Sequence, residues 1–111
     1  MYFTITSLKL KGPLHFLKVA GMTMKIARQL KSSEGFIQYK SSGMWSSVYT
    51  MSLWKTEKDM KNFARSGAHL EVMKRYREVS SEIRTLTLAA DKLPEWRIAR
   101  DMLDRNGRVV G

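Results

Sequence analysis

His69 is the residue whose type and position are best suited to chemistry. Imidazole titrates near neutral pH, so His69 could accept or donate a proton in a pocket. Trp54 and Phe63 precede it, and the pair Ser66-Gly67 predicts a break between two helices just before it. We therefore predict that any site lies beside His69, with Trp54 and Phe63 in its wall. A histidine that caps a helix or hydrogen-bonds a backbone carbonyl is the alternative, and the residue types alone leave both open.

Three further residues are candidates for lining the same pocket, namely Tyr49, Trp45 and His15. Trp45 and Tyr49 fall in a run of aromatic and β-branched residues that predicts a strand, although such a stripe is more often ordinary core. His15 follows Gly12-Pro13 at the start of a predicted helix, where it could flank the mouth of a pocket. A solvent-exposed histidine is the alternative at that position.

Several classes of enzyme are disfavoured because their motifs are missing from the sequence. It contains no Gly-rich phosphate loop, no histidine and carboxylate cluster at metal-binding spacing, and no recognisable Ser-His-Asp set. We therefore predict no metal site. The polar groups that remain suit a small apolar molecule oriented by few contacts.

The composition is that of a globular domain, with 43% hydrophobic and 27% charged residues. The net charge of +10 could mark a surface for nucleic acid, but the basic residues are spread over the whole length, so nucleic-acid binding is unlikely. No apolar run is long enough to span a membrane, the first residues do not resemble a signal peptide, and cysteine is absent. We expect a cytoplasmic protein without a membrane span.

The elements that position these residues follow from hydrophobic periodicity and from turn residues. Thr56 is suited to cap a helix, with Asp59 three residues later, and the C-terminal helix is expected to end at Asn106-Gly107 in a left-handed turn. A hairpin turn is predicted at Ser42-Gly43. The predicted strands are residues 2–10, 35–41, 45–54 and 84–90, and the predicted helices are residues 14–31, 56–65, 68–83 and 94–106.

This order predicts one α+β domain over residues 1–111, with the ferredoxin-like order βαββαβ. A four-stranded antiparallel sheet would carry helices on one face, including a broken second helix, and an extra helix would follow at the C-terminus. The other sheet face is apolar and would be exposed in a monomer. Two such faces meeting as a closed dimeric barrel would cover it, so we expect a homodimer through the open sheet face.

One stretch of the sequence also resembles a known superfamily. It consists of the run Leu53-Trp54-Lys55-Thr56 followed by Met60, Phe63-Ala64, Ser66 and His69. Together with the order of elements, it resembles the dimeric α/β-barrel superfamily that includes the antibiotic-biosynthesis monooxygenases. Residues 63–75 are similar to the spheroidene-monooxygenase-like branch of that superfamily. The resemblance covers residues 2–90, and its specific motif covers residues 53–75.

The resemblance implies a monooxygenase-like protein that acts on or binds a small apolar molecule beside His69. It implies that His69 is either a haem ligand or an acid or base, since the superfamily includes haem-dependent enzymes and enzymes that work without any cofactor. Trp54, Phe63 and Tyr49 would shape the pocket. The superfamily also includes proteins with no known catalysis, so a non-catalytic ligand-binding or stress-associated dimer is the alternative.

Overall fold

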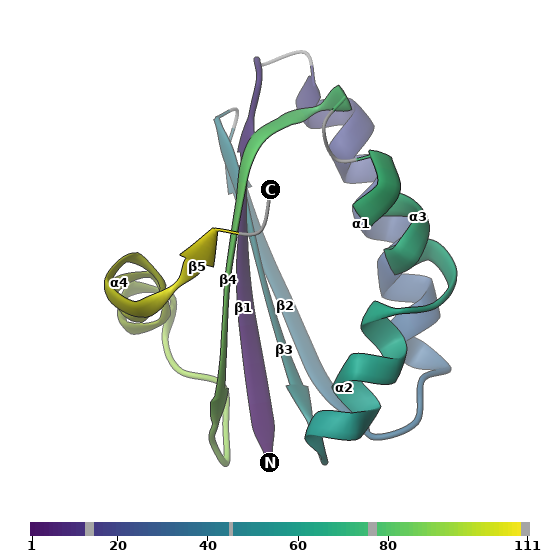
Figure 1. Cartoon of the computed structure of the whole chain (residues 1–111), viewed down its shortest axis with the longest axis vertical. Coiled ribbons are helices and arrows are strands. Elements are labelled where there is room, and N and C mark those ends of the chain that lie inside the picture. Colours follow the sequence, from purple (N-terminus) through teal and green to yellow (C-terminus); the bar gives the residue numbers. More distant parts are fainter. Residues whose placement is uncertain (13–14, 45, 76–77, 110–111) are drawn as a thin grey trace.

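A five-stranded antiparallel sheet forms the centre of the fold (Figure 1). In this computed structural model, residues 1–12, 15–44, 46–75 and 78–109 are described. The strand order is β2-β3-β1-β4-β5. The strands are β1 (Tyr2–Leu10), β2 (Phe36–Met44), β3 (Ser47–Trp54), β4 (Ser80–Ala89) and β5 (Arg108–Val109). The predicted α+β fold with ferredoxin-like order is confirmed, with a fifth strand added at one edge.

Helices cover both faces of the sheet (Figure 1). On one side lie α1 (His15–Lys31), α2 (Glu57–Ala64) and α3 (Gly67–Arg75), and on the other lies α4 (Trp96–Asn106). None of the helices in the described ranges is both long enough and apolar enough to cross a membrane. The sheet is therefore the middle of three layers. The space between the sheet and α4 and the space between the sheet and α1 to α3 are filled differently.

The space between the sheet and α4 is a packed hydrophobic core. Phe3 and Ile5 of β1 alternate with Thr4 and Thr6, so the apolar pair faces α4 while the threonines face the other helices. Ala99 and Leu103 of α4 are fully buried against this face.

The expectation that this sheet face is open in a monomer is therefore wrong, because α4 of the same chain covers it. Arg100 holds α4 in place by lying 4.4 Å from the centre of the Tyr49 ring and by donating a hydrogen bond of 3.3 Å to the Ser42 hydroxyl. The homodimer stays a prediction, and the bare face on which it was based does not exist in the single chain.

The helix predicted over residues 68–83 is too long, because its last part belongs to β4. Ile83 pairs with Leu8 of β1, and both Val79 and Ile83 are buried. The Ser80 hydroxyl donates to the carbonyl of Lys9 at 2.8 Å and so fixes the start of the strand. Apolar residues four apart fit a helix and a strand alike, and pairing with β1 favours the strand.

Two turn predictions are also corrected. Ser42 and Gly43 lie within β2, opposite Tyr49 and Val48, and the connection to β3 follows Met44. Gly107 has φ −68° rather than a left-handed value, because the chain continues in extended form into β5 and pairs with β4. The pairing of Arg108 with Thr85 therefore holds the chain in the sheet beyond the end of α4.

Candidate functional site

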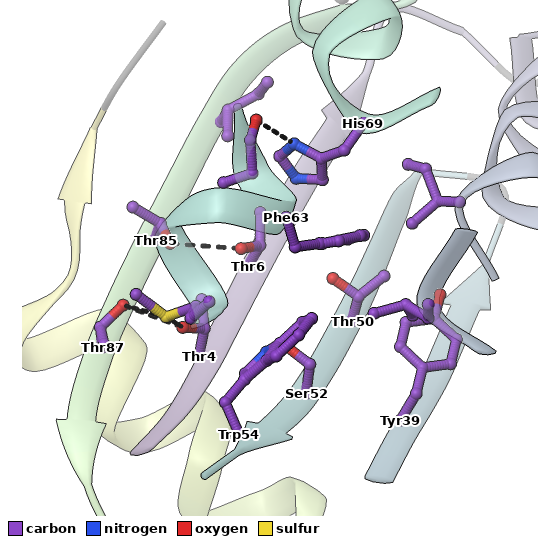
Figure 2. A pocket seen from close by; sticks show the side chains of 15 residues that line it. Thr4, Thr6, Tyr39, Thr50, Ser52, Trp54, Phe63, His69, Thr85 and Thr87 are labelled. Carbon is purple, nitrogen blue, oxygen red and sulfur yellow. Dashed lines mark hydrogen bonds between the residues drawn. The ribbon is translucent and has the colours of Figure 1, made fainter. Parts of the chain in front are cut away.

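A cavity of about 290 Å³ lies between the sheet and helices α1 to α3 (Figure 2). The two sides of the cavity differ in chemistry, and none of the described lining residues is Lys, Arg, Asp or Glu. The helix side is apolar, whereas the sheet side carries a group of hydroxyls. The lining residues on the helix side include Ile26, Leu30, Met60, Phe63 and Ala64, and the hydroxyls of the sheet are those of Thr4, Thr6, Thr50, Ser52, Thr85 and Thr87.

Four aromatic rings follow one another along this region. The ring centres are 5.7 Å apart for Phe36 and Trp54, 5.2 Å for Trp54 and Phe63, and 5.1 Å for Phe63 and His69. Such spacings are those of stabilising aromatic pairs. Three of these residues, Trp54, Phe63 and His69, line the cavity, which is the grouping that the sequence predicted for the neighbourhood of His69.

The break between α2 and α3 places His69. Thr56 caps the start of α2 by accepting a hydrogen bond from the backbone N–H of Asp59 at 3.1 Å, as predicted. After α2 ends, Gly67 has φ +58°, a left-handed value that glycine adopts without strain. A Cβ atom at this position would also lie 2.9 Å from the Gln29 side chain. His69 is consequently the third residue of α3 and turns toward the sheet.

Gln29 of α1 joins the two helices at this break. Its Nε2 donates to the carbonyls of Ser66 at 2.8 Å and Phe63 at 3.3 Å, and its Oε1 accepts from the His69 backbone N–H at 2.9 Å. One side chain thus satisfies unpaired groups at the end of α2 and at the start of α3. The position of His69 therefore depends on a residue forty positions earlier in the chain.

The His69 ring is half-buried, and its hydrogen bond identifies its tautomer. Nδ1 lies 3.0 Å from the carbonyl oxygen of Ala64, which can only accept, so Nδ1 carries a proton. Burial lowers the pKa of His69, and the hydrogen bond to Ala64 opposes this to a lesser extent. Near neutral pH the ring is uncharged, and its unprotonated Nε2 is on the side turned away from Ala64, toward the sheet (Figure 2).

The hydroxyls on the sheet form two rows across β3, β1 and β4. In the first row Ser52, Thr4 and Thr87 are neighbours, and in the second Thr50, Thr6 and Thr85 are neighbours. Thr4 and Thr87 are hydrogen-bonded at 2.9 Å, and Thr6 and Thr85 at 3.2 Å (Figure 2). The sheet therefore presents a polar but uncharged surface to the cavity.

Tyr39 of β2 closes one side of the cavity. Its hydroxyl is buried and has no hydrogen-bond partner among the described residues. Burial raises the pKa of Tyr39. The Ser41 hydroxyl is near enough to lower this pKa by a smaller amount, although it is not in hydrogen-bond geometry with the Tyr39 hydroxyl. The phenol stays protonated at neutral pH, so it adds no charge to the cavity.

The remaining predicted site residues lie elsewhere. Tyr49 faces the opposite side of the sheet, where it packs against α4 and Arg100, so the expectation that it shapes the pocket beside His69 does not agree with the structure. The side chain of His15, at the start of α1, is not part of the cavity lining. Trp45 falls outside the described residues. Alternation along a strand separates Tyr49 from Trp54, because residues an odd number apart face opposite sides.

Sequence reasoning missed the hydroxyl surface and Gln29. The signal for the hydroxyls was visible as alternating Ser and Thr in three strands: Thr4 and Thr6, Thr50 and Ser52, Thr85 and Thr87. Its meaning depends on the strand order, which brings the three pairs together. Gln29 gave no signal, because a glutamine on a basic helix is ordinarily exposed to water.

Haem, one of the possibilities implied by the resemblance in sequence, does not fit this cavity. The protonated Nδ1 with a carbonyl partner is the arrangement of many iron-binding histidines. However, about 290 Å³ lies just below the roughly 300–1,000 Å³ range of small-molecule sites. That volume is too small for a porphyrin, and the described lining offers no cation for its propionates. The described residues also contain no group of three or more His, Cys, Asp or Glu able to hold a metal ion.

Known proteins resemble this chain in two respects, a sequence match to one family and a shared fold. A model of the DUF3291 family, described as a domain of unknown function, matches residues 18–105. No curated protein has a significantly similar sequence. Solved structures give a clearer likeness, although each shares so few identical residues with the chain that the fold alone can be compared.

Three of these solved structures illustrate the likeness in fold. SnoaB, a cofactor-independent oxygenase from Streptomyces nogalater, is similar with 15% identity and a TM-score of 0.67, over 85% of this chain and 97% of that one. A candidate antibiotic biosynthesis monooxygenase from Nitrosomonas europaea has 14% identity and a TM-score of 0.73, over 83% and 100%. Rv0793 from Mycobacterium tuberculosis has 11% identity and a TM-score of 0.73, over 86% and 97%. The predicted likeness in fold to the antibiotic-biosynthesis monooxygenases is thus confirmed.

Proposed function

The chain belongs to the DUF3291 family, and we propose that it is a monooxygenase-like protein which binds a small, mainly apolar molecule in the cavity beside His69. The cavity supports this because its helix side is apolar, its volume suits a ligand of a few rings, and its described lining carries no charged side chain at neutral pH. The expected cytoplasmic location belongs to the same proposal.

The observation that carries the proposal is the state of His69. The Ala64 carbonyl holds the proton on Nδ1, so Nε2 is free to act as a base toward a molecule in the cavity. Because burial lowers the pKa of His69, the ring is in its basic, uncharged form at neutral pH. Phe63, in contact with the ring, limits its rotation.

In this proposal Nε2 takes a proton from an acidic C–H of the ligand and leaves a carbanion that can react with dioxygen. For a methylene group, the overall change is CH₂ + O₂ → C=O + H₂O. The substrate supplies all the electrons that reduce dioxygen, one oxygen atom enters the product, and the other leaves as water. The apolar wall formed by Trp54 and Phe63 would exclude bulk water from the carbanion.

Anthrone, a flat molecule with one activated methylene, is a suitable probe. Binding is followed by the change in tryptophan fluorescence, because Trp54 lines the cavity, and oxygenation is followed with an oxygen electrode. We expect binding and oxygen consumption above the rate in buffer. The His69→Ala variant should lower that consumption by about 10²-fold or more, as expected for loss of a general base.

The matched control is His15→Ala, which removes the other histidine of the sequence. Because His15 is not part of the cavity lining, this variant should leave the rate of oxygen consumption unchanged. Binding without oxygen consumption would favour the alternative, a non-catalytic ligand-binding protein. Absence of both would contradict the proposal for this class of ligand.

We also propose that two copies associate, on the side of the sheet that α4 covers. Leu88 of β4 and Ile98 of α4 are exposed apolar residues on that side, and their burial would favour association. Light scattering should then give twice the chain mass of 12.8 kDa. A charged substitution, Ile98→Glu, should restore the monomer, whereas Leu17→Glu on α1 should not. A monomeric mass for the wild type would contradict this proposal.

A further inference from the structure

The hydroxyls of Thr50 and Ser52 are the feature of the cavity that the proposed function leaves unused. Both residues are on β3, two positions apart, and both face the helices α1 to α3. Each hydroxyl has one hydrogen to donate and two lone pairs. The hydrogen bonds that each hydroxyl already makes within the protein determine which donors and acceptors remain for a ligand.

The hydroxyls on β1 and β4 bond to one another or to neighbouring groups. Thr4 is bonded to Thr87 and donates to the Sδ atom of Met60, and Thr85 is bonded to Thr6 and reaches the carbonyl of Ile5 at 3.4 Å. Their hydrogens are used within the wall of the cavity. They contribute polarity there, but they are not free donors.

The two hydroxyls on β3 differ. The Ser52 hydroxyl accepts a hydrogen bond from the indole Nε1 of Trp54 at 2.9 Å, and its own hydrogen is donated to none of the described residues. The Thr50 hydroxyl makes no hydrogen bond with any described residue. In Figure 2 the Thr50 oxygen points into the space between Phe63 and Trp54. Two free donors therefore face the cavity from one strand.

Strand geometry sets the separation of these donors. Residues two apart on an antiparallel strand lie on the same face and are about 7 Å apart. His69, at the far side of Phe63 from Trp54, contributes an acceptor, Nε2. Besides the Tyr39 hydroxyl, which also has no partner among the described residues, the cavity thus offers two donors at a fixed spacing on β3 and the acceptor Nε2, against an apolar wall.

We propose that Thr50 and Ser52 orient the ligand, and that this ligand is a flat, uncharged molecule with two hydrogen-bond acceptor oxygens about 7 Å apart. The proposal rests on the proposed function in that it uses the same cavity. It goes further because it replaces a merely apolar ligand with one whose oxygens match the two donors on β3. Thr50 and Ser52 are positioning residues that act on specificity, and His69 keeps its separate role.

Size-matched probes test this spacing. In 2,7-dimethoxynaphthalene two acceptor oxygens lie about 7 Å apart, matching residues i and i+2 of a strand. The compound 2,7-diethylnaphthalene has the same shape and no oxygen, and 2,3-dimethoxynaphthalene has two adjacent oxygens. Affinities are measured by equilibrium dialysis. We expect the first probe to bind the wild type about fivefold or more tightly than the other two, since one net hydrogen bond is worth roughly that factor.

The Thr50→Val variant keeps the shape of the side chain and removes the donor, so this preference should fall about fivefold. The control is Thr85→Val, the same change on the same surface at a hydroxyl that already has partners, and it should keep the preference. Ser52→Ala is checked by circular dichroism first, because it removes the acceptor of the Trp54 indole.

The outcomes separate the two proposals. If all three probes bind equally to the wild type, or if Thr50→Val keeps the preference, the inference is overturned while the cavity still binds apolar molecules. If no probe binds, the proposed function and this inference fail together. A preference for 2,7-dimethoxynaphthalene that is lost in Thr50→Val and kept in Thr85→Val supports both.

Discussion

His69 combines three properties that bear on its chemistry. It contacts an aromatic ring, its Nδ1 is hydrogen-bonded to a backbone carbonyl, and it is half-buried at the edge of a cavity. Burial is the main cause of its lowered pKa. The same burial makes the folded protein sensitive to pH, because the protonated ring is less stable in the fold than in the unfolded chain.

This gives a prediction for stability. Because the pKa is lower in the folded state, the unfolded chain binds the proton more readily below about pH 6.5, the usual histidine value. The stabilising contribution is thus complete above about pH 6.5 and is lost as the pH falls below it, by at most about 1.4 kcal/mol per pH unit. Urea unfolding at several pH values between about 5.5 and 7.5 measures this slope.

The His69→Gln variant should show a flatter dependence over the same range, since glutamine does not titrate. The His15→Gln variant leaves His69 in place and should keep the slope of the wild type. Equal slopes in the wild type and His69→Gln would show that His69 is not the group responsible.

At the scale of elements, the break between α2 and α3 is held by a third helix. Gln29 of α1 bonds to the carbonyls of Phe63 and Ser66 and to the N–H of His69. Two short helices, of 8 and 9 residues, would be marginal by themselves. The link to α1 therefore stabilises both helices and aligns the ring of His69 with the cavity.

We expect Gln29→Met to lower the free energy of unfolding by about 1–3 kcal/mol, because it leaves partly buried backbone groups without partners. The measurement is denaturant unfolding followed by circular dichroism. Gln38→Met is the control, because Gln38 is exposed, and its effect should stay within about 0.5 kcal/mol. If the two variants lose the same amount, the hydrogen bonds of Gln29 contribute nothing measurable.

At the scale of the whole molecule, α4 converts a two-layer arrangement into three layers. It brings Ala99 and Leu103 onto a sheet face made by Phe3, Ile5 and Met51. The chain after α4 then returns as β5 and pairs with β4. Helix α4 is consequently part of the core, and its packing should contribute to the cooperative unfolding of the whole described fold.

Leu103→Ala tests this contribution. Leu103 is 0% exposed, so the substitution should cost about 2–5 kcal/mol through loss of burial and formation of a cavity. Leu17→Ala is the matched control, since Leu17 on α1 is 72% exposed and should change stability by less than about 0.5 kcal/mol. A small effect of Leu103→Ala would mean that α4 is only loosely attached.

Local sequence patterns predict the type and approximate order of most elements. Alternation fixed residues 2–10 as β1, the Thr56 and Asp59 pair marked the start of α2, and Ser66-Gly67 marked the break before His69. These signals are local, because propensity, capping and turn chemistry depend on residues close in the chain. The same local reasoning grouped Trp54, Phe63 and His69 correctly.

Packing between distant parts of the chain determines how the elements face one another. On α1, Ala20 and Met24 are apolar yet exposed, because apolar residues occur almost all around this helix and its rotation depends on packing. Residues 80–83 follow a spacing compatible with helix and strand, and pairing with β1 decides for the strand. Alternation places Tyr49 and Trp54 on opposite faces of β3, but only packing determines that α4 covers the face of Tyr49 and that the cavity lies on the face of Trp54. Such outcomes depend on contacts between residues far apart in the chain, which local patterns do not specify.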